Sequence, residues 1–446
     1  MNFSELVTFS GLVQFSPDSK YFAVVKQTAL TIYSVSDIET LANWPLADQP
    51  SNLEWSRDSR YLLTTHQKRG IVQIYSVADQ AWSGRITLTP CGVANAFWSP
   101  DSLQILAITD FELRLSAWNL TDMSVYHIKN PKFNDKGYSF SSDGKFMILA
   151  ERNEGKDYIG IYYTGDWQVV NHFATETFDL EDAKWTPDDT AIIVWDSCLV
   201  YSLIIYSPLG TPLARHRPYD NGLGIKTLSV SPNGTFIAAG SYDQSARVFT
   251  KISWRFLSEF PHQNQITEGS DIHIYKEEEY NESLGFGGAE ERLTSKYGMQ
   301  EIPVKLPTLK VPKDKPNPPT GVSLCEWSNN TNYLATRNDS QPNVLWLWNM
   351  ATLSLNVILI QQQPIKNAEW NSKTLHLAFC TGTPRLFLWS LEGASVCDVP
   401  LENKDFKVQK IVWSPDGQSM ILMDKNKLLI AYPQFEVLEA GNEEYF

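Results

Sequence analysis

The sequence predicts an all-β fold, a propeller of about nine four-stranded blades closed into one ring. Two observations support this prediction. A short turn motif recurs along the chain at intervals of about 43 residues, and segments rich in β-branched and aromatic residues lie between the turns. A period in the low forties is typical of propeller blades. No long segment shows the 3.6-residue period of an amphipathic helix.

The turn motif is an aromatic or apolar residue followed by a turn resembling Ser-Pro-Asp-Gly. Proline presets φ at the second turn position, and Asp or Asn tolerates the next one. Gly or a small polar residue then takes the left-handed position that reverses the chain. The nine copies are FSPDS at Phe15, WSRDS at Trp55, WSPDS at Trp98, FSSDG at Phe140, WTPDD at Trp185, VSPNG at Val230, WSNNT at Trp327, WNSKT at Trp370 and WSPDG at Trp413.

Strands can be placed on both sides of each turn. One that ends in an aromatic residue precedes it, a compact apolar strand follows it, and a third strand begins some ten residues later. For Trp82, Trp167 and Trp254, which fall in the outer-strand region, we favour burial between blades over exposure as binding anchors. The tryptophans directly before the turn are expected in the core: Trp55, Trp98, Trp185, Trp327, Trp370 and Trp413.

The repeat is interrupted once, because 97 residues separate Val230 from Trp327. The excess is acidic at first (KEEEYNE) and then rich in Pro and Lys (LPTLKVPKDKPNPP). We interpret it as an insertion rather than a linker between two propellers, since the three blades that follow cannot close a ring alone. The predicted division is blades one to six in residues 1–264, the insertion in 265–320, and blades seven to nine with a C-terminal tail in 321–446.

The segment NFSELVTF, residues 2–9, precedes the first core strand. It lies where the outer strand of a preceding blade would be. We expect it to complete the last blade, which would join the chain ends and cover an exposed sheet edge.

Composition argues against several classes of function. The net charge is −14, with 37 Lys and Arg against 51 Asp and Glu, which opposes a nucleic-acid surface. We also expect no signal peptide and no membrane insertion, because the N-terminus lacks a positive region and no run of about 18 apolar residues occurs. The cysteines form no CxxC pair, and we expect reduced, buried thiols in a cytosolic protein at Cys91, Cys198, Cys325, Cys380 and Cys397.

No motif for catalysis or cofactor binding is present, so we expect neither an enzyme nor a cofactor. The sequence contains no nucleophile elbow, P-loop, HExxH or dinucleotide-binding glycine pattern. His262 and His273 lie close together in sequence, but we expect ordinary surface residues rather than metal ligands. The acidic pairs Glu181-Asp182 and Asp188-Asp189 are expected to cap turns and face solvent.

The repeats resemble the WD-repeat propeller family, and all nine units take part. The segment GSYDQSARVF, residues 240–249, fits best, and it places Asp243 in the turn between the second and third strands. The Gly-His pair usual ahead of the first strand is essentially missing. The sequence therefore does not predict the hydrogen-bonded Asp-His-Ser/Thr-Trp network of regular repeats.

A finer resemblance covers nearly the whole chain, including the insertion. The segments that show it are KRGIVQIYSV (68–77), ERNEGKDYIGIYYTGDWQVVNHF (151–173), VWDSCLVYSLIIYSPLG (194–210), LGIKTLSVSPNGTFIAAGSYDQSARVF (223–249), IYKEEEYNESLGFG (274–287), SKYGMQEIPVKLPTLK (295–310) and YLATRNDSQPNVLWLWN (333–349). They look like the WD repeat-containing protein eight family, whose vertebrate member is encoded antisense to a tumour-protein-family gene.

This resemblance implies a non-catalytic subunit in the cytoplasm and cytoskeleton, at centrosomes, spindle poles, centriolar satellites and basal bodies. It implies pairing with a coiled-coil microtubule-anchoring protein of the synovial-sarcoma-X-breakpoint-interacting type. It also implies tethering of microtubule minus ends, with gamma-tubulin or other minus-end proteins contacted indirectly, and support of cilium assembly. A propeller subunit of a translation or RNA-processing assembly is the alternative.

The candidate partner-binding residues lie where the chain departs from the repeat. An acidic, Pro-rich insertion can lie as an ordered strap over the disc or fold upon a partner. A second candidate is the basic stretch HQKRG, with Lys68 and Arg69, for which a solvated loop tip is the simpler interpretation. The insertion candidates are Tyr275, Lys276, Glu277, Glu278, Glu279 and Tyr280.

Overall fold

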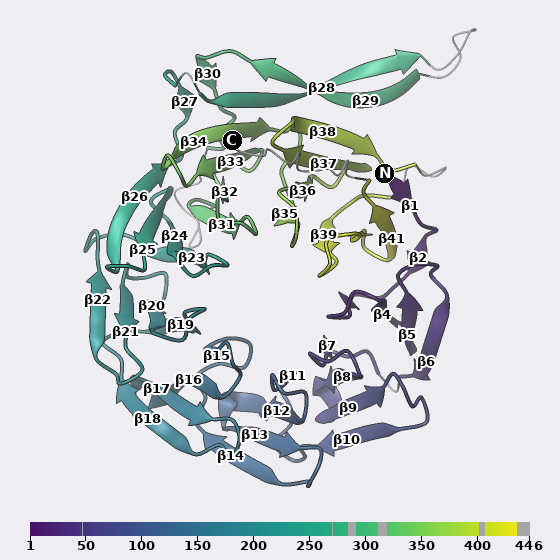
Figure 1. Ribbon diagram of the computed structural model, residues 1–446, viewed down its shortest axis with the longest axis vertical. Coiled ribbons are helices and arrows are strands. Elements are labelled where there is room, and N and C mark those ends of the chain that lie inside the picture. The colour runs from purple at the N-terminus through teal and green to yellow at the C-terminus, as the bar shows by residue number, and fades with distance from the viewer. Residues whose placement is uncertain (47, 270, 284–290, 311–318, 401–405, 435–446) are drawn as a thin grey trace, which may run out of the picture.

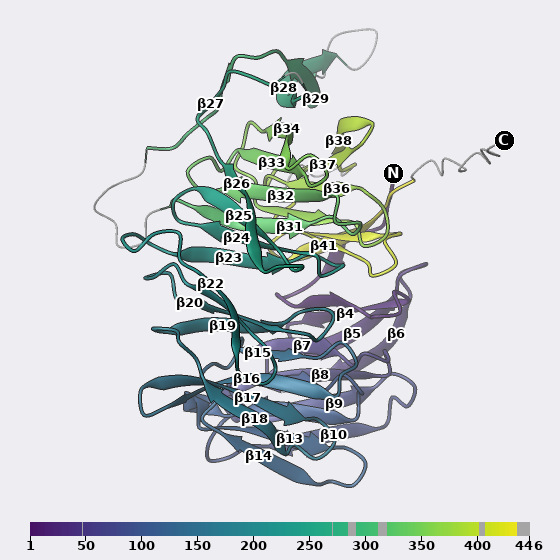
Figure 2. The ribbon, with the colours of Figure 1, turned by 60° about the vertical axis from the view of Figure 1, so that its left-hand side comes forward.

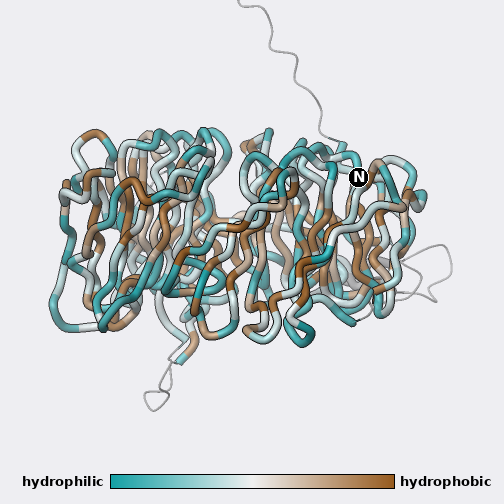
Figure 3. The backbone as a smooth tube through the Cα atoms, turned by 90° about the horizontal axis from the view of Figure 1, so that it is seen from below, coloured by the Kyte–Doolittle hydropathy of each residue, from teal (hydrophilic) through white to brown (hydrophobic). Residues whose placement is uncertain are grey.

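The computed structural model describes residues 1–46, 48–269, 271–283, 291–310, 319–400 and 406–434, and these form a ring of nine blades. Blades one to eight each contain an antiparallel meander of four strands, whose first strand lies nearest the centre of the ring and whose fourth lies towards the rim (Figure 1). Seen edge-on, the ring is a flat disc with loops on two faces (Figure 3). The predicted fold class is confirmed.

The first three blades follow one another along the chain. Two 3-10 helices, η1 (Gln67–Arg69) and η2 (Asp110–Glu112), lie in their turns. No helix in the described part of the chain has the length and apolar character that a membrane crossing requires. The strands are β3 (Val13–Phe15), β4 (Tyr21–Lys26), β5 (Ala29–Ser34) and β6 (Thr40–Pro45) in blade one; β7 (Asn52–Trp55), β8 (Tyr61–His66), β9 (Ile71–Ser76) and β10 (Ser83–Thr87) in blade two; and β11 (Asn95–Trp98), β12 (Gln104–Ile108), β13 (Arg114–Asn119) and β14 (Val125–Lys129) in blade three.

Blades four to six repeat this order. Their strands are β15 (Tyr138–Phe140), β16 (Phe146–Asn153), β17 (Lys156–Tyr163) and β18 (Val169–Ala174) in blade four; β19 (Leu180–Trp185), β20 (Ile192–Asp196), β21 (Leu203–Tyr206) and β22 (Pro212–His216) in blade five; and β23 (Ile225–Val230), β24 (Phe236–Ser241), β25 (Ser245–Thr250) and β26 (Arg255–Pro261) in blade six. Asp243 lies between β24 and β25, as expected.

The last three blades follow four further strands that are described with the candidate site. Their strands are β31 (Val322–Trp327), β32 (Tyr333–Asn338), β33 (Val344–Asn349) and β34 (Ser354–Ile360) in blade seven; β35 (Asn367–Trp370), β36 (Leu377–Cys380), β37 (Arg385–Ser390) and β38 (Gly393–Asp398) in blade eight; and β39 (Lys410–Trp413), β40 (Met420–Met423) and β41 (Lys427–Tyr432) in blade nine.

The N-terminal segment closes the ring, as expected. Strands β1 (Asn2–Phe3) and β2 (Val7–Thr8) both pair antiparallel with β41 and supply the outer edge of blade nine. Ser4 between them donates its backbone N–H to the carbonyl of Ile430 at 2.9 Å and accepts the N–H of Ile430 on Oγ at 2.8 Å. Apolar side chains of blades nine and one then share one core, which includes Phe22 and Leu428.

The repeat turns adopt the conformation that their sequence predicts. The fifth position of the motif has a positive φ of 60° to 72° in eight of the nine copies. Where it is serine, its hydroxyl accepts a hydrogen bond from the preceding blade: Ser59 Oγ accepts the Asp18 N–H at 3.1 Å, and Ser102 Oγ accepts the Asp58 N–H at 3.3 Å. The motif therefore reverses the chain and also joins neighbouring blades.

The tryptophans that precede the turn also join the blades. All six are buried, as predicted. Five donate their indole N–H to a backbone carbonyl of the preceding blade, on the residue just before that blade's own aromatic position. The bonds are Trp55 to Gln14 (3.2 Å), Trp98 to Glu54 (3.4 Å), Trp327 to Ser229 (3.4 Å), Trp370 to Glu326 (3.0 Å) and Trp413 to Glu369 (3.1 Å).

Blade seven contains a polar network that sequence reasoning missed. Trp348 donates its indole N–H to Thr336 Oγ1 at 2.8 Å, and Thr336 Oγ1 lies 2.8 Å from Nε2 of His262. Nδ1 of His262 lies 2.9 Å from the carbonyl of Gln244, so Nδ1 must be the protonated nitrogen and Thr336 donates to Nε2. The expectation that His262 lies on the surface is wrong, because its ring is buried against Trp346 and Trp348. Burial lowers its pKa to about 4.

Several smaller expectations also need correction. Cys325 and Cys380 are buried, but Cys198 is exposed, and Cys91 and Cys397 are half-buried; all five are free thiols. Trp167 is buried as favoured and Trp254 is half-buried, whereas Trp82 is 40% exposed, with its ring 5.6 Å from that of Tyr61.

The acidic pairs are less exposed than expected. Asp182 is half-buried and accepts the N–H of Gly137 from the neighbouring blade at 2.8 Å, and burial raises its pKa. Asp189 accepts the N–H of Ser142 at 2.8 Å. These carboxylates cap turns across a blade boundary rather than facing solvent alone.

Candidate functional site

Four strands between blades six and seven form the largest departure from the repeat: β27 (Gln265–Ile266), β28 (His273–Ser283), β29 (Glu291–Gln300) and β30 (Val304–Lys305). Strands β28 and β29 form an antiparallel hairpin, and β27 pairs with β30. Figure 2 shows the hairpin outside β34, at the periphery of the disc. Residues 284–290 and 311–318, to which the predicted insertion also extends, lie outside the described residues.

The hairpin is built into blade seven. Its first strand, β28, pairs in parallel with β34 from His273 opposite Val357 to Lys276 opposite Ile360. Blade seven thus becomes a six-stranded sheet in the order β29-β28-β34-β33-β32-β31. Ile266, Ile274 and Leu306 are buried in the core shared by blades six and seven. These contacts make this segment part of the folded disc.

The inner face of the hairpin is fixed to blade eight by an arginine. Arg385 of β37 is buried, and its guanidinium lies 3.4 Å from Glu277, 2.7 Å from Glu279 and 3.3 Å from Asp398. Glu277 is only 2% exposed, and it also accepts hydrogen bonds from the Ser295 hydroxyl and the Gln362 N–H, both at 2.9 Å. One cation therefore holds two hairpin carboxylates against the propeller.

Two tyrosines complete this inner face. Tyr297 packs edge-on against Tyr275 and against Phe387 of blade eight. Its hydroxyl accepts a hydrogen bond of 2.6 Å from the Gln361 side chain, and burial raises its pKa well above the usual value. The hairpin consequently covers the boundary between blades seven and eight.

The outer face of the hairpin carries exposed charges and one exposed aromatic ring. Lys276 and Glu278 of β28 are exposed, and Tyr280 is 41% exposed. Glu278 lies opposite Lys296 of β29 in the strand register, and the Lys296 ammonium lies 5.2 Å from the centre of the Tyr280 ring. This is the side of the hairpin that a partner can contact.

The structure separates the predicted site residues into three groups. The first group, on the exposed outer face of the hairpin, is Lys276, Glu278 and Tyr280. The second group, on the inner face, is Tyr275, Glu277 and Glu279, of which Glu279 lies beside Arg385.

The third group is Lys68 and Arg69. Both are exposed in η1, on the opposite part of the ring in blade two, as a solvated loop tip would be (Figure 1). The structure does not bring them together with the hairpin.

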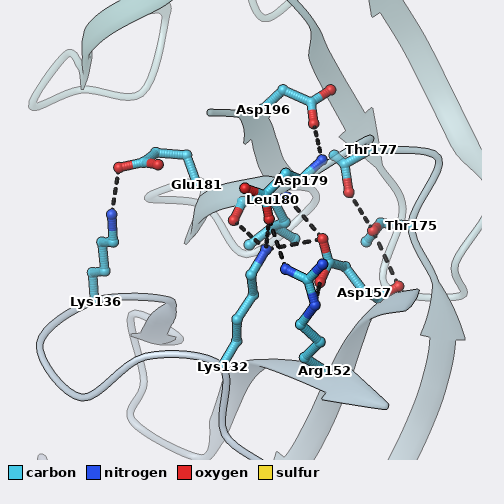
Figure 4. Close-up of polar contacts among 10 residues, drawn as sticks. All are labelled: Lys132, Lys136, Arg152, Asp157, Thr175, Thr177, Asp179, Leu180, Glu181 and Asp196. Carbon is cyan, nitrogen blue, oxygen red and sulfur yellow. Dashed lines mark hydrogen bonds and ion pairs between the residues drawn. The ribbon is translucent and has the colours of Figure 1, made fainter. Parts of the chain in front are cut away.

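A second polar cluster joins blades four and five on the face that carries the loops between blades. Lys132 is nearly fully buried, and its ammonium lies 2.9 Å from Asp157, 2.8 Å from Asp179 and 2.7 Å from the carbonyl of Leu180 (Figure 4). Arg152 also contacts Asp179 at 2.8 Å. Hydrogen bonding by Lys132 lowers the pKa of Asp179. Because every charged group here has a partner, the cluster stabilises the boundary between blades rather than offering a reactive site.

Among the described residues, no group of three or more His, Cys, Asp or Glu side chains is arranged to hold a metal ion. The features above are surfaces and fixed polar contacts. Such an arrangement can bind another macromolecule through exposed side chains on a rigid disc.

Comparisons with known proteins agree with this description. The family model described as "WD domain, G-beta repeat" matches residues 210–250, which include the segment around Asp243. The chain is 37% identical to "WD repeat-containing protein WRAP73" of Mus musculus over 444 residues, 97% of this chain and 96% of that protein. It is 25% identical to an uncharacterized WD repeat-containing protein of Schizosaccharomyces pombe over 336 residues, 71% of this chain and 65% of that protein.

A solved structure is similar in fold. The C-terminal WD40 domain of Sif2 aligns with a TM-score of 0.52 at 11% identity, covering 97% of this chain and 99% of that one. The ring and its relatives define a WD-repeat propeller, a class of protein–protein interaction folds. The chain belongs to the WD-repeat protein family.

Proposed function

We propose that this chain is a non-catalytic scaffold of the WD repeat-containing protein eight type. It acts at centrosomes, spindle poles or basal bodies, binds a coiled-coil anchoring protein of the synovial-sarcoma-X-breakpoint-interacting type, and through it helps to tether microtubule minus ends and to support cilium assembly. The location and the partner follow from the family resemblance of the sequence.

One structural observation supports a scaffold above the others. The hairpin β28–β29 is anchored on its inner face by Arg385 and presents Glu278, Tyr280 and Lys296 on its outer face. A partly exposed aromatic ring among charges, on a rigid support, suits a surface that anchors a partner. A helix of a coiled coil, with its own charged flanks, can meet such a surface.

The test uses substitutions on this outer face rather than removal of the insertion. Deleting the segment would remove Ile266, Ile274 and Leu306 from the core of blades six and seven and would unfold the site. The double variant Glu278→Lys/Tyr280→Ala leaves those contacts intact. We expect it to fold normally, to lose capture of the coiled-coil partner, and to be depleted from spindle poles.

The matched control is Lys68→Glu/Arg69→Glu, which alters exposed charges in blade two. It should retain partner capture and localisation. Normal localisation and capture in the hairpin variant would exclude the hairpin as the interface. Wild-type protein that is absent from spindle poles and that purifies with ribosomal subunits after nuclease treatment would contradict the proposal itself.

A further inference from the structure

A cleft of about 530 Å³ opens between the base of the hairpin and the segment that follows it. Lys276 and Glu277 lie on the β28 side, and Lys305 and Thr308 lie on the opposite side, in and after β30. The end of β34, including Ile360, lies at the junction of the two sides. This cleft exists only because the insertion lies against blade seven.

The walls of the cleft are held by hydrogen bonds and strand pairing. Lys305 pairs with Gln265 across β27 and β30, and Leu306 donates its N–H to the carbonyl of Asn264 at 2.9 Å. On the other wall, Gln362 bonds to Glu277 through both its backbone N–H and its side-chain amide, each at 2.9 Å. A ligand would therefore meet a preformed site, which reduces the cost of ordering it.

Two lysines of the cleft are available to bind a ligand, whereas the carboxylate of Glu277 is already bonded within the protein. Among the residues that the structure describes, no Asp or Glu oxygen lies within ion-pair distance of Lys276 or Lys305, and both lysines are exposed. Glu277 lines the same cleft, but its two oxygens are already taken by Ser295, Gln362 and Arg385.

We propose that this cleft binds an extended acidic segment of a partner protein. Carboxylates of the segment pair with Lys276 and Lys305, and an apolar side chain between them contacts Ile360 and Val304 on the cleft wall. The inference deepens the proposed function and rests on it in one respect, that the chain is a protein-binding scaffold. It names a second contact, at the base of the hairpin, which shares Lys276 with the outer face but does not include Glu278 or Tyr280.

The lining favours a peptide over other anions. Gln300 adds an amide group that can donate to and accept from a peptide backbone. The side-chain N–H groups of Asn343 already donate to the carbonyls of Gln361 and Gln362, so Asn343 can offer a peptide only its amide oxygen. A free phosphate or small dicarboxylate would engage the lysines but leave the apolar wall and the amides without partners. A nucleic acid would engage the two lysines through its phosphates, but the described residues that line the cleft include no aromatic ring on which a base could stack.

The experiment is a selection from a random twelve-residue peptide library displayed on phage. The purified full chain is the target, and the double variant Lys276→Glu/Lys305→Glu is selected in parallel at about 0.15 M salt. Peptides enriched on the wild-type chain over the variant should carry two or more Asp or Glu residues around an apolar residue. Fluorescence anisotropy with the most enriched peptide should show affinity for the variant weaker by about tenfold or more.

Two controls complete the test. Lys68→Glu/Arg69→Glu carries the same charge change in blade two and should bind the peptide as the wild type does. Millimolar inorganic phosphate should not displace the peptide. Enrichment of the same peptides on both targets, enrichment of basic or neutral peptides, or displacement by phosphate would overturn the inference.

The two proposals can fail separately. Selective binding of acidic peptides by a chain that is absent from spindle poles would support the cleft and refute the proposed cellular role. A chain that captures its coiled-coil partner through Tyr280, but selects no acidic peptide, would refute only the proposal that the cleft binds an acidic segment.

Discussion

The backbone N–H of Asp416 donates a hydrogen bond of 2.9 Å to the hydroxyl of Ser19. Asp416 belongs to the last repeat turn and Ser19 to the first. The same kind of contact joins blade one to blade two and blade two to blade three, and here it joins blade nine to blade one. Ser19 has a φ of 61°, a left-handed conformation that a non-glycine residue adopts at some cost. The serine hydroxyl therefore offsets local strain with a bond across the closure.

This balance predicts different effects for two substitutions at one site. Ser19→Ala should lower the free energy of unfolding by about 1 kcal/mol, because it loses the bond and keeps the strain. Ser19→Gly should cost less, because glycine adopts positive φ readily and recovers roughly the same amount. Urea titration of both variants measures the difference. Equal stability of the two would show that the strain at Ser19 is negligible.

The buried His262 predicts a pH dependence. Its pKa is about 4 in the folded chain and about 6.5 when unfolded. The folded state therefore binds fewer protons between these values, and the stability contributed by neutral His262 is present above pH 6.5 and is lost as pH falls towards 4. His262→Gln should be less stable than wild type at pH 7.5, and the gap should narrow by pH 5. A constant gap in denaturation midpoints across this range would contradict the assignment.

Two half-buried glutamates predict the opposite trend. Burial raises the pKa of Glu54 and of Glu369 to about 7 in the folded chain, above the ordinary value of 4.5. Here the folded state binds more protons, so the stability is fully present below pH 4.5 and is lost as pH rises through 7. Glu54→Gln and Glu369→Gln should raise the thermal unfolding temperature at pH 8 and leave it nearly unchanged at pH 4.5. A loss of stability at pH 8 would show that the charged forms are needed.

Arg385 should control attachment of the hairpin. Arg385→Met leaves Glu277 buried without its cation, which is expected to cost about 3 kcal/mol. Hydrogen–deuterium exchange should accelerate in β28 and β29 more than in blades one to four. Arg215→Met is the matched control, because Arg215 pairs with Glu176 on the exposed rim and should cost less than about 1 kcal/mol. Uniform acceleration around the ring would mean that Arg385 supports the whole fold rather than the hairpin.

Lys132 should behave as part of a unit with Asp157. Lys132→Met removes the cation from a buried carboxylate and should destabilise the boundary of blades four and five by about 3 kcal/mol. The double variant Lys132→Met/Asp157→Asn should recover much of that loss, because no charge is left uncompensated. The measurement is a double-mutant cycle by urea denaturation. Additive losses would indicate that the two residues act independently.

The fold could be predicted because the interactions that specify it join residues close together in the sequence. Ser-Pro-Asp-Gly in the last turn specifies its own conformation within four residues, so the blades could be counted from the sequence. Closure by residues 2–9 could also be predicted, because an unpaired sheet edge needs a partner and only one segment was left over.

The site was less accessible to prediction because its contacts are distant in sequence. Glu277 and Arg385 lie 108 residues apart, and nothing in the acidic stretch distinguishes the buried Glu277 from the exposed Glu278 until the strand register is known. His262 could have been recognised by its place before blade seven, but the insertion separates it from Thr336 by 74 residues and hides the usual spacing.

The pairing of the N-terminal segment with β41 bears on the chain entropy of the whole ring. Ser4 and Ile430 are 426 residues apart, roughly ten times the length of one blade. Loop-closure entropy grows only with the logarithm of length, so bringing these ends together costs only about 2 kcal/mol more than closing a loop of one blade's length. A few hydrogen bonds and the apolar contacts of β1 and β2 can offset that amount. Adding a ninth blade therefore raises the entropic cost of closing the ring only slightly. The size of the ring is decided instead by how neighbouring blades pack.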